Sequence, residues 1–344
     1  DGRGLSYFVY DRANQAVTVR RIENKLGIKG SPTAELVFNN APAQLVGDRK
    51  LGLIKYVMSL MNGARLGVGA QSVGLAEAAY REAVKYANER EQFGKAIINF
   101  PQVYEMLANM RAKTDAIRTL LYETARSVDM YKSLEAISRE RKLENDERAT
   151  LKTYSRLADA LTPMLKLFSS EYANQITYDC IQVHGGSGFM KDYACERFYR
   201  DARILTIYEG TSQLQVVAAI RGVVSGAYVA RIKEYEAIEV RDELKPLRQT
   251  LISLREAFEQ CYEKVKEFGS SSEAFDFNSR RLVEIAGYLI MGNLLVNDAN
   301  KDEMFTKSAR IMTKIAQAEI EKAITYINNF DASILEDYKS LIAE

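Results

Sequence analysis

The sequence predicts a mainly α-helical protein: a truncated antiparallel β segment, then an antiparallel four-helix bundle, then an additional helical C-terminal region. Three observations support this. Short extended runs fill the start of the chain, apolar residues then recur at steps of three and four, and the long helical stretches have brief connections. We therefore divide the 344 residues into the end of a β-domain (1–50), the bundle (51–226) and a helical extension (227–344).

The first unit contains three short extended runs separated by glycine and proline, namely Leu5–Tyr10, Ala16–Arg20 and Glu35–Phe38. Three short strands make an incomplete sheet, and the chain begins at Asp1 without a methionine. We therefore expect upstream sequence, including the rest of this sheet, to be missing.

The bundle is predicted from the change to helical periodicity near residue 52. Ile54, Val57, Met61, Ala64 and Val68 form an apolar stripe, and this first helix is expected to reach about residue 89. Its glycines lower helix propensity and predict the close approach of a neighbouring helix or a ligand. Further helices are expected after Pro101, over about 150–180, and from near Thr211.

The extension is predicted to contain helices near 241–268, 278–297 and 302–328, broken at residues 269–272. The densely charged segment 139–148, within the bundle, is interpreted as a solvated helix end or connector. A buried face of the extension is predicted from its apolar positions, such as Leu282, Ile285, Leu289 and Met291.

Composition excludes several classes of function. Lysine plus arginine number 47 and aspartate plus glutamate 46, so nothing electrostatic indicates a nucleic-acid partner. No apolar run approaches the roughly 20 residues that span a bilayer, although membrane association of the extension stays open. A single histidine, His184, excludes a multi-histidine metal site. Cys180, Cys195 and Cys261 suit a reducing compartment, the cytoplasm of a bacterium or the mitochondrial matrix of a eukaryote.

The first motif that carries chemistry is Arg90–Lys95, which closes the first long helix. The forked donors of Arg90 suit a phosphate, and Phe93 offers a ring for a base or ring system. The alternative is a basic residue that complements the helix dipole.

The second motif is Gln182–Phe189, with three glycines in four positions that let the backbone approach a ligand closely. It follows a helix and so does not fit the dinucleotide-binding fingerprint; a plain connection between helices is the alternative. His184 within it is interpreted as a packing or hydrogen-bonding residue more than a catalytic base.

The third motif is Ile207–Gln213, in which Glu209 lies between an apolar approach and a helix opening. Burial beside Ile207 and Tyr208 suits a carboxylate that acts as a general base. Thr211 or Ser212 can cap the following helix, which is the structural alternative for this motif.

Together the three motifs resemble the acyl-CoA dehydrogenase family, in its order and at similar spacing, over residues 1 to about 226. The remainder matches only the looser pattern of a helical C-terminal extension found in some members. The resemblance implies FAD-dependent α,β-dehydrogenation of an acyl-CoA thioester to a trans-2-enoyl-CoA. Glu209 would remove the α-proton while hydride passes to flavin N5. The Glu209 N–H, with a flavin ribityl hydroxyl, would stabilise the enolate oxygen.

The resemblance also implies the other site residues and the partners. Some relatives carry the base on the first long helix, but Asn62–Arg65 holds no carboxylate. The implied partners are the acyl-CoA substrate, electron-transfer flavoprotein as acceptor, and further copies of the chain in a dimer or tetramer. The FAD of the neighbouring subunit would contact seven residues, namely Arg90, Gln92, Phe93, Gln102, Gln182, Gly185 and Gly186. The FAD of the same subunit would contact Thr211 and Gln213. The substrate would lie near Arg65, Tyr208 and Gly210.

One departure from the family is that its front helical domain has no counterpart before Asp1. We therefore expect this chain alone not to oxidise acyl-CoA. Two alternatives remain open: a non-catalytic helical module for assembly or partner binding that retains remnant motifs, and an acyl-CoA oxidase that passes electrons to oxygen.

Overall fold

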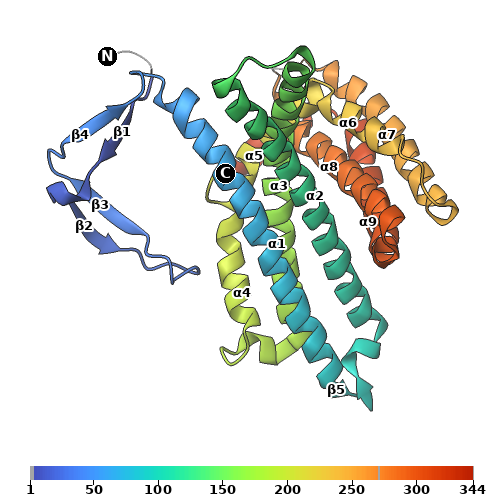
Figure 1. Cartoon of the computed structure of the whole chain (residues 1–344). Coiled ribbons are helices and arrows are strands. Elements are labelled where there is room, and N and C mark those ends of the chain that lie inside the picture. Colours follow the sequence, from blue (N-terminus) through green and yellow to red (C-terminus); the bar gives the residue numbers. More distant parts are fainter. Residues whose placement is uncertain (1–3, 270–271, 344) are drawn as a thin grey trace.

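The computed structural model of the chain describes residues 4–269 and 272–343, apart from the side chains of residues 54, 55, 58 and 59. Asp1, the side chain of Ile54 and the centre of the predicted break at 269–272 therefore lie outside what is described. Helices form the body of the molecule, and the short strands stand beside it at the N-terminal end (Figure 1). The predicted mainly helical fold is confirmed.

The β segment contains four strands and not three. They are β1 (Tyr7–Tyr10), β2 (Val17–Ile22), β3 (Ala34–Phe38) and β4 (Ala43–Val46). They form two separate antiparallel ladders, β1 with β4 and β2 with β3, so the single incomplete sheet that we predicted was wrong. Apolar side chains stay exposed on both ladders, including Phe8 at 54% and Phe38 at 63%.

The bundle is built from three long helices and a shorter fourth. Helices α1 (Met58–Glu89), α2 (Pro101–Glu140) and α3 (Asn145–His184) run antiparallel in succession, and α5 (Ser212–Val224) packs against α3. Pro101 opens α2 as predicted, because its fixed φ suits the first helical position. The charged segment contains the end of α2 and the start of α3, which confirms its interpretation.

Helix α3 lies at the centre of the bundle, in contact with α1, α2 and α5. Its contact with α1 is close: a Cβ on Gly69 would lie 2.7 Å from Leu165 Cδ2. Among the glycines of α1, Gly69 therefore confirms the predicted approach of a neighbouring helix. Gly63, Gly67 and Gly74 have no neighbouring atom of this chain within 4 Å of such a Cβ.

The extension packs on the bundle through α2 and α5 (Figure 1). Its predicted apolar face is confirmed, since Leu282, Ile285, Leu289 and Met291 are fully buried. The sequence did not indicate two of its short helices, α6 and α10. The helices of the extension are α6 (Ala227–Glu236), α7 (Lys245–Lys266), α8 (Glu273–Lys301), α9 (Thr306–Asn328) and α10 (Ile334–Ala343).

Helix α8 is more apolar than we predicted. Among the described residues it is the one single helix long and apolar enough to cross a membrane, and α5 with α6 would pass only as a bent pair. However, 83% of the apolar window of α8 is buried inside the structure, as expected for a core helix.

Candidate active site

The loop between α4 (Cys195–Ala202) and α5 holds Glu209 in an unusual backbone conformation. Glu209 has a φ of 54° and the following Gly210 a φ of 94°. For a residue with a side chain, this left-handed region costs about 1–2 kcal/mol, and such outliers gather at functional sites. Thr211 then ends the loop as the N-cap of α5, as the sequence predicted.

Side chains from three helices hold the two carbonyl groups of this turn. The Glu209 carbonyl accepts hydrogen bonds from Arg65 Nε at 3.2 Å and from Gln215 Nε2 at 3.3 Å. The Gly210 carbonyl accepts from Lys166 Nζ at 2.6 Å and from Gln215 Nε2 at 3.0 Å. The donors lie on α1, α3 and α5, so the turn is fixed to the frame of the bundle.

A small apolar cluster packs beneath the loop that carries Glu209, on the side of the bundle core. Val68, Ala173, Ala202 and Leu205 are buried together, and the partly buried Tyr208 packs against them. The phenol of Tyr208 donates to Gln71 Oε1 on α1. Burial and then the neighbouring charge of Glu209 raise the pKa of Tyr208, which keeps the phenol protonated as a donor.

One oxygen of the Glu209 carboxylate is free of hydrogen bonds from the described residues. Its Oε2 atom is buried and has no hydrogen-bond partner among the described residues. Buried polar atoms are nearly always paired, so an unpaired one requires an explanation, and a catalytic role is one such explanation. A carboxylate held in this way, with a free oxygen, can accept a proton from a bound molecule.

The Arg90 motif forms a tight hairpin at the far end of α1. Strands β5 (Glu91–Gln92) and β6 (Lys95–Ala96) are joined by Phe93 and Gly94, both in the left-handed region with φ of 51° and 79°. A two-residue loop with both φ positive is the preferred connection of a hairpin. It leaves Phe93 93% exposed, and Arg90, Gln92 and Gln102 are exposed beside it.

The glycine motif lies at the C-terminal end of α3. Gln182, Gly185 and Gly186 are exposed, and a Cβ on either glycine would meet no atom within 4 Å. His184 is buried: its Nδ1 lies 2.7 Å from the Cys180 carbonyl oxygen, and its ring stacks on Tyr86. This confirms its interpretation as a packing and hydrogen-bonding residue.

The structure thus places the predicted residues in two separate groups. The hydroxyl of Tyr86, near the end of α1, donates a 3.2 Å hydrogen bond to Ser187 Oγ, which follows the end of α3. The Arg90 hairpin and the glycine motif therefore lie at the same end of the bundle. Glu209, Gly210, Arg65, Tyr208 and Thr211 gather elsewhere. The distance from Arg65 to Arg90 is about 38 Å at 1.5 Å per helical residue. Figure 1 shows the hairpin at the opposite end of α1 from its N-terminus.

Comparison with known families identifies the family of this chain. The family model described as "Acyl-CoA dehydrogenase, C-terminal domain" matches residues 54–223. A second model, "Acyl-CoA dehydrogenase C terminal", matches residues 224–335. The chain belongs to the acyl-CoA dehydrogenase family. The resemblance seen in the three motifs is therefore confirmed, and it extends through the helical extension.

Individual members of the acyl-CoA dehydrogenase family are similar over part of their length. The 3-(aryl)acrylate reductase of Clostridium sporogenes is 36% identical, with 62% of this chain and 51% of that protein covered. The caffeyl-CoA reductase-Etf complex subunit CarC of Acetobacterium woodii is 35% identical, with 62% and 50% covered. The chain therefore spans about half the length of these curated relatives.

A solved family structure extends the likeness over almost the whole chain. The acyl-CoA dehydrogenase of Bacillus anthracis, complexed with FAD, superposes with a TM-score of 0.76 at 25% identity. The match covers 99% of this chain and 62% of that one.

Three residues that contact the Glu209 loop were missed in the sequence. Gln71 and Gln215 gave no signal, because glutamine on a helix is common at a solvated surface. Lys166 did leave one: it stands alone in the apolar run Met164–Phe168, where a helical lysine faces the core.

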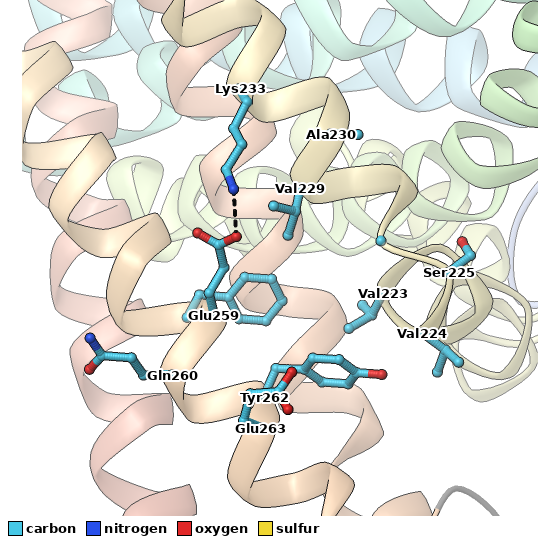
Figure 2. A pocket seen from close by; sticks show the side chains of 12 residues that line it. Val223, Val224, Ser225, Val229, Ala230, Lys233, Glu259, Gln260, Tyr262 and Glu263 are labelled. Carbon is cyan, nitrogen blue, oxygen red and sulfur yellow. Dashed lines mark hydrogen bonds and ion pairs between the residues drawn. The ribbon is translucent and has the colours of Figure 1, made fainter.

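One surface pocket lies away from these residues. It measures about 720 Å³ and lies between α7 and the bend from α5 to α6. Its lining is mostly apolar, including Val223, Val229 and Phe258, with a Lys233–Glu259 ion pair of 2.7 Å at one side (Figure 2). None of the predicted site residues lines it.

Proposed function

We propose that the full-length protein is a flavin-dependent oxidoreductase that converts an acyl-CoA thioester to the trans-2-enoyl-CoA, with Glu209 as the base. The observation that carries this proposal is the Glu209 turn: a strained backbone, fixed by three helices, that presents a carboxylate with an unpartnered oxygen. The proposal concerns the whole protein, since this chain spans about half the length of its curated relatives.

In this mechanism, the Glu209 carboxylate accepts the α-proton of the thioester. The α-proton is weakly acidic, so its loss requires the negative charge on the thioester oxygen to be stabilised as it develops. The Glu209 N–H is a donor whose direction is fixed by the same turn. FAD, when bound, supplies the acceptor for the β-hydride. The residues of this chain orient the thioester and hold the proton.

The exposed residues at the other end of the bundle fit FAD. Arg90 offers a fork for phosphate oxygens, Phe93 an open ring face, and Gly185 and Gly186 an unobstructed backbone. Arg90 lies about 38 Å along α1 from Arg65, so it is far from the Glu209 turn of its own chain. We infer that these residues serve the FAD of a neighbouring copy, whereas Thr211 and Gln213 lie beside that of their own chain. This supports a homo-oligomer, a dimer or tetramer.

The substitution Glu209→Gln in the full-length protein tests the assignment of the base. The amide keeps the shape of the side chain but cannot accept the proton, so turnover should fall by more than about a hundredfold. Flavin content should not change. Glu135→Gln, at an exposed position on α2, is the matched control and should keep full turnover. Near-normal turnover of Glu209→Gln would reject the assignment.

A second candidate is the reverse reaction, reduction of a 2-enoyl-CoA. It is favoured by the two relatives whose names are those of reductases. Glu209 would then donate its proton to the α-carbon, as microscopic reversibility requires. Steady-state rates in both directions, at matched driving force, distinguish the two.

We further propose electron-transfer flavoprotein as the redox partner, because one relative is named as a subunit of an Etf complex. Hydrogen peroxide formed from oxygen at the rate of substrate loss would favour the oxidase alternative. A colourless purified full-length protein that takes up no FAD would favour the non-catalytic helical module.

A further inference from the structure

The core of the bundle contains a lysine next to the Glu209 turn. Lys166 lies on α3 between Leu165 and Leu167, and its side chain is fully inaccessible to solvent. Among the described residues it is the only lysine buried to this degree. Burial of a cation is unfavourable unless its charge is compensated. A lysine at this buried position therefore requires an explanation.

The ammonium group of Lys166 has one hydrogen-bond partner among the described residues. Nζ donates to the Gly210 carbonyl oxygen at 2.6 Å, across 44 residues of sequence. Burial and then the Arg65 charge lower the pKa of Lys166 to about 8, whereas the charges of Glu209 and Glu171 oppose this. The charges of Arg65 and Glu209 thus act on the pKa of Lys166 in opposite directions.

The close packing of α1 on α3 produces this arrangement. Gly69 lets α1 approach the side chain of Leu165, the residue before Lys166. Arg65, one turn earlier on α1, then reaches the Glu209 carbonyl while Lys166 reaches the Gly210 carbonyl. Two cationic donors from two helices thus hold two consecutive carbonyl groups.

We propose that Lys166 is a positioning residue that fixes the left-handed Glu209–Gly210 turn and so directs the Glu209 carboxylate and N–H at the substrate. This inference rests on the proposed function of Glu209. Two effects follow from it. Loss of the donor lets the turn relax, which misplaces the base, and loss of the charge makes the ionised carboxylate less favourable.

Substitution of Lys166 by methionine in the full-length enzyme tests the proposal. Methionine has a similar unbranched apolar stem without the donor or the charge, so the packing of the core is largely retained. We expect kcat to fall by roughly tenfold or more, with KM for acyl-CoA changed by less than about threefold and flavin content unchanged. The acid limb of the pH–rate profile should move to higher pH, because a positive charge that favours the ionised base is lost.

The control is Lys113→Met. Lys113 on α2 is also partly buried and bonds Gln175 on α3 at 2.9 Å, but it does not touch the turn. This variant should keep both kcat and the pH profile of the parent. If Lys166→Met does not fold, Lys166→Gln, which keeps a donor without the charge, replaces it and should show the same shift of the acid limb.

The outcomes separate this inference from the proposed function. Suppose that Glu209→Gln has no turnover but Lys166→Met has normal kcat and a normal pH profile. This result would overturn only the role of Lys166. Near-normal turnover of Glu209→Gln would overturn the proposed function and this inference with it. A fall in kcat without a shift of the acid limb, for either Lys166 variant, indicates a merely structural lysine and counts against the proposal.

Discussion

Ser308 Oγ donates a 2.7 Å hydrogen bond to Asp115 Oδ2 inside the core, and this bond joins α9 of the extension to α2 of the bundle. The same carboxylate pairs with Arg111 and Arg118, each at 2.8 Å. The Asp115 carboxylate thus binds Ser308, Arg111 and Arg118 at one point. The extension is therefore joined to the bundle by a hydrogen bond to a charged group as well as by apolar contacts.

Asp115→Ala should therefore destabilise the protein by about 2–3 kcal/mol, because it leaves the two arginines and the serine without their shared partner. Ser308→Ala removes one neutral donor and should cost about 1 kcal/mol. Urea denaturation of both variants measures the difference. Equal losses of unfolding free energy would show that the charge of Asp115 contributes nothing.

Glu123 predicts an acid-sensitive step in stability. Burial raises its pKa, but hydrogen bonds from Arg126, Arg231 and Tyr235 outweigh this and hold the pKa below the ordinary 4.5. A carboxyl whose folded pKa is depressed stabilises the fold above 4.5, and this contribution is lost as the pH falls through the folded value. The stability of the parent should therefore decline on acidification below about 4.5.

Glu123→Gln checks this origin of the decline. The variant should be less stable than the parent near neutral pH, and it should lose less unfolding free energy between about pH 5 and pH 3. Glu135→Gln, at an exposed position, should leave the slope unchanged. A parallel decline of parent and Glu123→Gln would contradict the assignment.

Two glycines of α1 should respond oppositely to alanine. Gly69→Ala puts a Cβ 2.7 Å from Leu165 Cδ2 in a packed core, which should cost about 1–3 kcal/mol. Gly74→Ala meets no neighbouring atom, so better helix propensity should stabilise the chain by about 0.5–1 kcal/mol. Thermal denaturation measures the change in stability of both variants. A change of the same sign at the two positions would show that the close packing of α1 on α3 does not determine the effect of the added methyl group.

Arg90→Ala should weaken FAD retention by the full-length oligomer, because the fork that suits phosphate oxygens is lost. Arg81→Ala, at an exposed position on the same helix, is the control. Flavin content across a dilution series measures the effect, which should vanish in a forced monomer. Equal retention by both variants would count against a role for Arg90.

Long-range periodicity explains how much of the fold the sequence could predict. The first bundle helix and the buried face at Leu282 and Leu289 followed from apolar spacing that lasts for several turns, whereas Pro101 indicated the start of α2. Strand β4 and helices α4 and α6 are only 4, 8 and 10 residues long, too short for such a signal. The pairing of β1 with β4 depends on tertiary contacts that no local pattern encodes.

The sequence indicated the motif residues of the candidate site, but neither its supporting donors nor its geometry. The motif indicated a helix opening after Glu209, whereas the left-handed backbone of Glu209 depends on donors that come from Arg65 and Lys166, far away in the sequence. The division of the predicted residues into two groups likewise follows from the length of α1, which only the folded chain reveals.

That division has a genetic consequence under the proposed sharing of FAD between copies. A chain with Arg90→Ala and a chain with Glu209→Gln would each be defective alone. In a mixed dimer, however, one of the two centres would receive an intact Arg90 from one chain and an intact Glu209 from the other. The two defective alleles would thus complement each other when expressed in the same cell, because each mixed dimer would have one of its two centres intact.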